Sequence, residues 1–294
     1  MIAPPRLSSI LLWNSLMRDV HVGDAAIPVI GFGTYGLSEA DVRRLAPAAI
    51  DAGFRHFDTA QIYGNEAAIG DCVAASHRPR REFFLTTKVW VSNYAKRQFE
   101  ASVNESLRKL RTDYIDLLLL HWPGSDIPLA EQIAGLNAVA RAGKVRHIGV
   151  SNFNRAMMTE AIRLSAVPLV TNQFEYHPYL NQSVLIESAR QAGLAVTAYC
   201  AMAIGRVFGD DALKAIAGRH GKTIAQIVLR WLVQQPGTVA LSRTTRIDRL
   251  AENLAIFDFA LDDAEMAAIH ALATAGSRIV DPPGLAPVWD STAP

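Results

Sequence analysis

The chain has little of several features that mark specialised classes of protein. It contains two cysteines, Cys72 and Cys200, which cannot form a disulfide framework, so we expect a reducing, cytoplasmic setting. Its net charge is +1, which gives no overall attraction to nucleic acid or to a membrane surface. No apolar run reaches membrane-spanning length, and no histidine or carboxylate cluster has the spacing of a metal site. We therefore expect no nucleic-acid, membrane or metal partner.

The N-terminal residues also lack a clear targeting signal. The apolar stretch at 10–13 is too short for a signal-peptide core, and no basic leader precedes it. We expect residues 1–19 to be a poorly ordered extension and residues 20–294 to form a single domain. A start at Met17 is an alternative that does not affect the domain.

What the chain does have is a regular alternation of apolar runs and helical patterns over 294 residues, half of them apolar. The apolar runs indicate buried parallel strands because they are apolar on both faces. Phe99, Val103 and Leu107 repeat at helical spacing, and Asp262 with Glu265 forms a capping-box pattern. The eight predicted strands span 31–35, 56–60, 83–89, 116–122, 145–152, 169–175, 195–201 and 238–243.

Eight strands alternating with a similar number of helices predict an α/β fold, the closed (β/α)₈ TIM barrel. The alternative is an open doubly wound sheet, which usually carries a glycine-rich turn after its first strand. Gly31, Gly33 and Gly36 resemble that turn, but no helix follows them directly. Residues 21–29 predict a hairpin that plugs the N-terminal end of the barrel, and residues 278–294 predict a long loop.

Four chemically active side chains stand at or just past the ends of predicted strands: Asp58, Tyr63, Lys88 and His121. Barrel enzymes place their chemistry at these ends. A buried ammonium at Lys88 needs a nearby carboxylate, which Asp58 on the neighbouring strand would supply. An ammonium beside Tyr63 would lower the pKa of the phenol, and His121 would orient a substrate carbonyl. The set predicts proton delivery to a carbonyl oxygen while a cofactor delivers hydride.

Each of these residues also has a structural interpretation. An Asp before a Thr is often a helix cap, a strand-end Lys is usually solvated, and a His before Trp-Pro can pack in a core. Their joint placement on successive strands favours one site. A hydrolase on the same barrel is an alternative, but it would need a nucleophile or metal in place of Tyr63 and Lys88, and we find neither.

A second group of residues follows the last predicted strand. Arg243, Arg246 and Arg249 crowd the start of a helix, where the macrodipole disfavours cations. A bound phosphate would resolve this conflict, because helix N-termini and guanidinium groups both bind phosphate. A solvated basic rim is the alternative.

Five motifs in order resemble those of the aldo-keto reductase family. They occupy residues 53–66, 87–90, 121–123, 149–153 and 172–179, and the resemblance extends from Val29 to Trp289. It implies NADPH-dependent reduction of aldehydes or ketones to alcohols by a monomer. The bacterial members that it resembles, the 2,5-diketogluconate and small-aldehyde reductases, imply small reactive aldehydes, 2-oxoaldehydes such as methylglyoxal, or keto-sugar acids as substrates. Some members act as cofactor-occupied channel subunits, so a regulatory subunit with little turnover is the alternative.

The resemblance also implies roles for individual residues. Tyr63 would be the general acid, Asp58 and Lys88 its tuning pair, and His121 the carbonyl-orienting group. The residues implied to bind NADPH are Thr34, Tyr35, Asp58, Ser151, Asn152, Gln173, Tyr199, Arg243, Thr244, Arg249, Glu252 and Asn253. Within that set, residues 151, 152 and 173 would hold the nicotinamide carboxamide, residue 199 would stack on its ring, and residues 243, 244 and 249 would hold the 2′-phosphate. Residues 252 and 253 would reach the adenine. The residues implied to line the substrate pocket are Tyr35, Trp90, His121 and Trp122.

The sequence departs from the family pattern in two places. Ser242 stands where proline is usual, and residues 200–205 replace the Ser-Pro-Leu-Gly or Gly-Pro-Leu that commonly follows the stacking tyrosine. That loop normally covers the cofactor pyrophosphate, so we assign no pyrophosphate ligands there.

Overall fold

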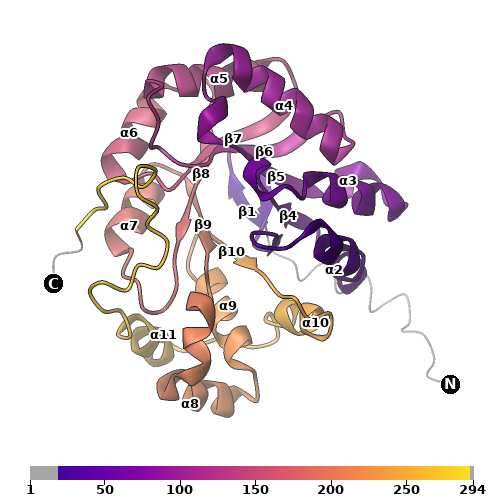
Figure 1. The fold of residues 1–294 in the computed structure, drawn as a ribbon. Coiled ribbons are helices and arrows are strands. Elements are labelled where there is room, and N and C mark those ends of the chain that lie inside the picture. Colours follow the sequence, from indigo (N-terminus) through magenta and orange to yellow (C-terminus); the bar gives the residue numbers. More distant parts are fainter. Residues whose placement is uncertain (1–18, 292–294) are drawn as a thin grey trace.

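The computed structural model describes residues 19–291, in which eight parallel strands close into a barrel surrounded by helices (Figure 1). The order around the barrel is β10-β3-β4-β5-β6-β7-β8-β9. The strands are β3 (Ile30–Gly33), β4 (His56–Asp58), β5 (Phe84–Val89), β6 (Ile115–Leu120), β7 (Val145–Ser151), β8 (Leu169–Glu175), β9 (Ala195–Tyr199) and β10 (Thr238–Ser242). The predicted TIM barrel is confirmed, and all eight predicted strands are present with ends shifted or shortened by a few residues. Gly31 and Gly33 lie within β3, so the doubly wound alternative is wrong.

The helices that cover the barrel follow the predicted patterns. Phe99, Val103 and Leu110 form the buried stripe of α4, and Asp262 and Glu265 form the predicted capping box of α11. The helices are α2 (Glu39–Ala52), α3 (Glu66–Ala75), α4 (Lys96–Leu110), α5 (Leu129–Arg141), α6 (Arg155–Leu164), α7 (Ser183–Gln191), α8 (Asp211–His220), α9 (Ile224–Gln234), α10 (Asp248–Leu254) and α11 (Asp263–His270). Short 3₁₀ turns are η1 (Gln61–Tyr63), η2 (Arg80–Glu82), η3 (Val91–Asn93) and η4 (Ala203–Gly209).

An antiparallel hairpin, β1 (Asp19–Val22) and β2 (Ala25–Pro28), precedes the barrel. Ala25 and Ile27 of β2 are fully buried and share one apolar cluster with inward residues of the barrel strands, among them Phe84, Leu117 and Val239. The hairpin therefore plugs the N-terminal end of the barrel, as predicted. Residues 1–18 of the predicted extension lie outside the described residues, whereas Asp19 is the first residue of β1.

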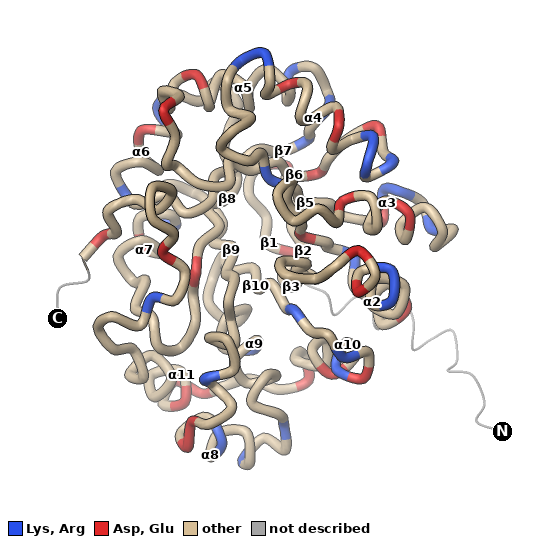
Figure 2. The backbone as a smooth tube through the Cα atoms, viewed as in Figure 1, with Lys and Arg blue, Asp and Glu red and all other residues tan. Residues whose placement is uncertain are grey.

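The outer surface is mixed in charge. Acidic and basic residues are interspersed over the helices in view, with no large face of a single sign (Figure 2). Within residues 19–291, we find no helix that is long and apolar enough to cross a membrane. The same range contains no group of three or more His, Cys, Asp or Glu side chains that would hold a metal ion.

Candidate active site

Asp58, Lys88, His121 and Tyr63 meet at the C-terminal mouth of the barrel, as the sequence predicts. Asp58 ends β4, Lys88 lies near the end of β5, His121 follows β6, and Tyr63 ends the η1 turn. Lys88 Nζ donates to Asp58 Oδ1 at 2.5 Å and to the Thr59 carbonyl oxygen at 2.7 Å. The side chains of Lys88 and Asp58 are only 1% and 4% exposed, so this is a buried ion pair. Such a pair fixes its own geometry, because separating either charge in a buried site is costly.

The predicted lowering of the Tyr63 pKa is wrong for this structure. The pKa of Tyr63 is raised well above its usual value, first by burial of the phenol and then by the negative charge of Asp58. Lys88 Nζ lies 5.2 Å from the centre of the Tyr63 ring, and its hydrogen bonds go to Asp58 and Thr59. Because Asp58 offsets the ammonium charge, desolvation dominates and the phenol keeps its proton.

His121 stands opposite the phenol. Its Nε2 lies 3.5 Å from the Tyr63 hydroxyl, while its Nδ1 is buried and has no hydrogen-bond partner among the described residues. Burial, followed by the positive charge of Lys88, holds the pKa of His121 well below its usual value. Trp90 contacts the imidazole edge to face at 5.2 Å, and Trp122 stacks against it at 6.5 Å. These contacts place a neutral imidazole between two aromatic walls.

Four of the residues expected to hold nicotinamide form one hydrogen-bond network with the Asp58 carboxylate. Gln173 Nε2 donates to Asp58 Oδ2 at 2.8 Å, and Ser151 Oγ donates to the Gln173 carbonyl oxygen at 2.9 Å. The Tyr199 hydroxyl donates to Asn152 Oδ1 at 2.7 Å. Asn152 has a left-handed backbone (φ 64°), which asparagine tolerates better than most side chains. Asn152 Nδ2 also donates to Ser151 Oγ at 3.1 Å, so the structure joins all four residues to Asp58.

The two predicted site residues that follow β3 lie in different settings. Thr34 is fully buried, and its hydroxyl donates to the Asp58 carbonyl oxygen at 2.9 Å. Tyr35 is 71% exposed, and its ring meets the Tyr63 ring edge to face at 5.2 Å. Thr34 therefore braces the backbone, whereas Tyr35 stands at the open rim.

The predicted phosphate site lies where β10 leads into α10. Arg243 is exposed and its Nη2 lies 3.4 Å from the Gly36 carbonyl oxygen; Arg249 lies against the Phe208 ring at 5.8 Å. Arg246 is instead paired with Asp248. Among the described residues, no carboxylate is paired with Arg243 or Arg249, which fits a cradle for an anionic group.

The remaining residues of this group are held by local bonds. Thr244 Oγ1 accepts from the Arg246 amide at 3.0 Å. Asn253 Nδ2 donates to Ser242 Oγ at 2.8 Å, and Asn253 Oδ1 is buried without a hydrogen-bond partner among residues 19–291. Glu252 accepts from the Thr223 hydroxyl at 2.8 Å, which ties it to the start of α9.

Sequence reasoning missed two residues that shape the mouth. Asn65 is fully buried; its Nδ2 donates to the carbonyl oxygens of Thr34 and Leu37, both at 3.0 Å. Gln61 Oε1 accepts from the Trp90 amide at 2.9 Å. Both residues lie in the motif at 53–66, and that placement was the available signal.

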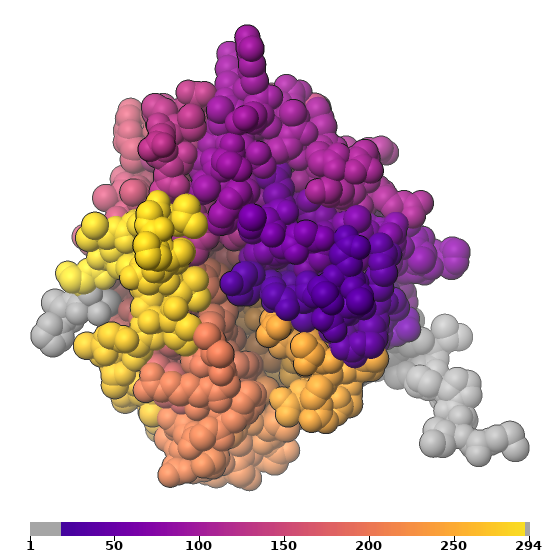
Figure 3. Space-filling model, viewed as in Figure 1, coloured from indigo at the N-terminus to yellow at the C-terminus, as the bar shows by residue number. Residues whose placement is uncertain are grey.

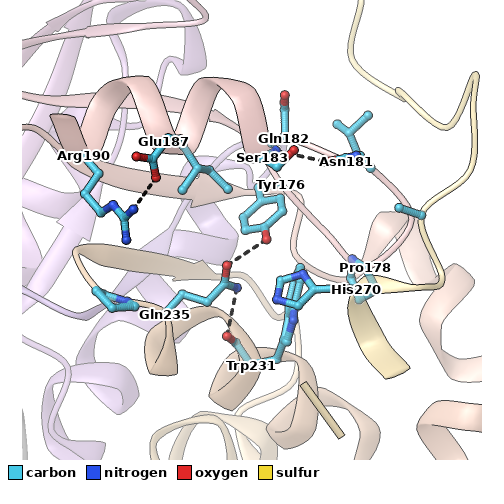
Figure 4. Close-up of a pocket in the computed structure, with 14 residues that line it drawn as sticks. Tyr176, Pro178, Asn181, Gln182, Ser183, Glu187, Arg190, Trp231, Gln235 and His270 are labelled. Carbon is cyan, nitrogen blue, oxygen red and sulfur yellow. Dashed lines mark hydrogen bonds and ion pairs between the residues drawn. The ribbon is translucent and has the colours of Figure 1, made fainter. Parts of the chain in front are cut away.

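A cavity of about 440 Å³ lies elsewhere, on the outer wall beside α7, α9 and α11 (Figure 4). Tyr176, Trp231 and Gln235 line it, and the Tyr176 hydroxyl donates to Gln235 Oε1 at 2.9 Å. None of the predicted site residues lines this cavity. The mouth, rather than this cavity, holds the chemically active groups.

Comparison with known proteins agrees with this geometry. The Aldo/keto reductase family matches residues 29–274. The methylglyoxal reductase DkgB of Salmonella typhimurium is 40% identical over 267 residues, covering 90% of this chain and 99% of that protein. An aldo-keto reductase of a Mycobacterium species is 42% identical over 84% of this chain and 87% of its own length.

Solved structures give the same assignment. The crystal structure of a putative 2,5-diketo-D-gluconic acid reductase B is 58% identical, covers 95% of this chain and 100% of its own, and has a TM-score of 0.93. The Bombyx mori aldo-keto reductase in complex with NADP is 33% identical over 87% of this chain and 92% of its own, with a TM-score of 0.82. The chain belongs to the aldo/keto reductase family of NADP(H)-dependent oxidoreductases.

Proposed function

We propose that this protein reduces small aldehydes or ketones to alcohols with NADPH, and that Tyr63 supplies the proton. The observation that carries the proposal is the buried network Lys88–Asp58–Gln173, which lies beside the Tyr63–His121 pair. One end of this network meets the residues expected to hold nicotinamide, and at the other end Lys88 Nζ lies 5.2 Å from the centre of the Tyr63 ring. Bound NADPH would supply the hydride.

The raised pKa of Tyr63 suits a proton donor. A phenol that stays protonated at neutral pH is always ready to donate. The substrate oxygen becomes far more basic than a phenolate as it gains negative charge during reduction. The Tyr63 hydroxyl would therefore donate its proton to this oxygen as the negative charge develops.

His121 is suited to orient the carbonyl. Its low pKa keeps the imidazole neutral, so one ring nitrogen carries hydrogen. Because Nδ1 is buried without a partner, a hydrogen there would be a lost donor, which costs more than an unpaired lone pair. We assign the hydrogen to Nε2, which faces Tyr63 and would donate to the same substrate oxygen.

The residues at the rim of the mouth support the choice of cofactor and substrate class. Arg243 and Arg249 would hold the 2′-phosphate, which distinguishes NADPH from NADH. Tyr35, Trp90 and Trp122 give the pocket aromatic walls, which pack on small apolar groups and stack on sugars. Together with relatives named for methylglyoxal and diketogluconic acid, this favours 2-oxoaldehydes, other small reactive aldehydes or keto-sugar acids.

A panel of carbonyls tests the proposal. Methylglyoxal, an aromatic aldehyde and a keto-sugar acid are each incubated with enzyme and NADPH or NADH, and loss of reduced cofactor is followed with product analysis. We expect turnover with NADPH on at least one carbonyl and weaker use of NADH. NADPH binding without turnover on any member would favour the regulatory-subunit alternative.

A further inference from the structure

One buried carboxylate at the mouth has no part in the mechanism above. Glu175 ends β8, is fully buried, and is the register partner of Tyr199 on β9. Directly paired residues on parallel strands point to the same face of the sheet. Because Tyr199 points to Asn152 inside the mouth, Glu175 points into the mouth as well. A carboxylate that is buried in this way needs hydrogen-bond donors or cations around it to offset the cost of leaving water.

Those partners belong to the C-terminal segment. Glu175 Oε1 accepts from the Ile279 amide and Oε2 from the Val280 amide, both at 2.8 Å. His177 Nε2 lies 2.9 Å from Glu175 Oε1. Hydrogen bonds from backbone amides to a carboxylate are charge-assisted and stronger than neutral ones. The Glu175 carboxylate thus accepts hydrogen bonds from two consecutive backbone amides.

The segment that contains these two amides, residues 278–291, is here named the C-terminal strap. The Arg278 guanidinium stacks on the Trp289 ring at 3.6 Å, and Trp289 Nε1 donates to Asp281 Oδ1 at 2.8 Å. Arg278 Nη1 also lies 3.9 Å from Glu175 Oε2. Residues near the two ends of the strap therefore meet, which makes it a compact closed loop.

The strap is attached again on its far side, beyond the ends of β6 and β7. The Gly124 amide donates to the Leu285 carbonyl oxygen at 3.0 Å, and Asn154 Nδ2 donates to the Val288 carbonyl oxygen at 2.9 Å. A Cβ at Gly124 would clash with the Gly284 carbonyl oxygen, so the two backbones approach closely. These contacts lie just past His121 and Asn152, and Figure 3 shows the yellow strap packed beside the magenta segments.

We propose that Glu175 is a positioning residue whose carboxylate holds the C-terminal strap closed over the substrate side of the mouth. It thereby sets how tightly the carbonyl compound is held, without touching the reacting atoms. The part that concerns substrate rests on the proposed function, whereas the attachment of the strap does not.

The corner that carries Glu175 is held independently of its carboxylate. Gln182 Nε2 donates to the Glu175 carbonyl oxygen at 2.8 Å, and the Tyr176 amide donates to the Tyr199 carbonyl oxygen at 3.1 Å. On the outer wall the Tyr176 hydroxyl is bonded to Gln235 (Figure 4). Glu175→Gln therefore keeps this corner but presents an amide hydrogen donor to one of the two strap amides. The substitution therefore weakens the attachment of the strap to residue 175 without disturbing this corner.

Limited trypsin digestion tests whether Glu175 holds the C-terminal strap, and it needs no assay of reductase activity. Cleavage after Arg278 requires the Ile279 amide to leave Glu175 and the Arg278 side chain to leave Trp289. We expect cleavage of this bond, followed by mass spectrometry, to be at least about tenfold faster in Glu175→Gln than in wild type. The matched control is Glu265→Gln, which changes another buried glutamate that accepts a backbone amide, on α11. It should leave Arg278 as protected as in wild type.

Kinetics test the link to substrate. In Glu175→Gln we expect KM for the carbonyl to rise about tenfold, while single-turnover hydride transfer at saturating carbonyl stays within about twofold. Gly124→Ala displaces the strap from its other attachment and leaves Glu175 unchanged, so it should raise KM in the same way. It also provides the test if Glu175→Gln folds poorly.

Three results would overturn the inference. The first is unchanged protection of Arg278 in Glu175→Gln, and the second is faster cleavage with an unchanged KM. The third is an equal loss of kcat and kcat/KM, which would place Glu175 in the chemistry. If wild type reduces no carbonyl, the proposed function fails and takes the substrate part with it, but the digestion still decides whether Glu175 holds the strap.

Discussion

The two sides of the barrel mouth are built on opposite principles. On one side, Asp58 and Lys88 are buried, and the pair is held by hydrogen bonds to the Thr59 carbonyl oxygen and the Gln173 side chain. On the other, Arg243 is exposed and touches one backbone oxygen at 3.4 Å. The first side is organised before any ligand arrives. The second has few contacts with the rest of the protein, so we expect substitutions there to change ligand binding and leave the fold alone.

The largest effect is expected from Tyr63→Phe. Removing the hydroxyl takes away the proton donor, so we expect kcat to fall about 10³- to 10⁴-fold. NADPH affinity, measured by quenching of tryptophan fluorescence, should stay nearly unchanged. Tyr176→Phe removes a buried tyrosine hydroxyl from the outer wall and should keep wild-type activity. Undiminished activity in Tyr63→Phe would assign the proton to another group.

The next effect concerns stability on the organised side. Lys88→Met leaves the Asp58 carboxylate buried without its cation, which should cost about 3 kcal/mol of unfolding free energy in urea titrations. Adding Asp58→Asn should recover most of this loss while activity stays absent. Arg43→Met breaks an exposed ion pair with Asp71 and should leave stability nearly unchanged. A small loss in Lys88→Met would show that the pair is not the organising element.

A smaller effect is expected on the open side. Arg243→Ala should weaken NADPH binding about 10- to 100-fold and NADH binding little, because only NADPH carries the 2′-phosphate. The NADPH loss should shrink at high salt, which screens exposed charges. Arg246→Ala is the matched control, since that guanidinium is already paired with Asp248. Equal losses for both cofactors would remove the 2′-phosphate assignment.

The smallest effect is a pH dependence of stability. The pKa of His121 in the folded protein lies well below its ordinary value of 6.5. As pH falls below about 6.5, the unfolded chain therefore binds a proton at this residue that the folded protein does not bind. Wild type should therefore hold its His121 contribution above about pH 6.5 and lose it below, by at most about 1.4 kcal/mol per pH unit. His121→Gln should show a shallower loss between about pH 6.5 and 5. Parallel curves for the two proteins would contradict the assignment of a neutral, buried imidazole.

Much of this architecture was predictable because it follows from local patterns. Strands apolar on both faces and polar residues at their ends are visible in sequence, which located the barrel and the groups Asp58, Tyr63, Lys88 and His121. The direction of the Tyr63 pKa was not, because it depends on how deeply the phenol is buried and on how close the Asp58 carboxylate lies in three dimensions.

Glu175 was not found for a related reason. A glutamate at a strand end carries no sign of its partners, and these lie more than 100 residues later in the chain. The hydrogen-bond partner of Thr34 was not predicted either, since it is a backbone oxygen of another strand. Long-range hydrogen bonds to backbone leave no local pattern in a sequence.

The hairpin of β1 and β2 has a consequence for the timing of proton replacement. Ala25 and Ile27 pack in an apolar cluster at the bottom of the barrel, so we expect water to reach the phenol from the mouth. In the proposed reaction the alcohol product would leave by that same opening. Tyr63, the proposed proton donor, would therefore regain its proton from water only after the product has left.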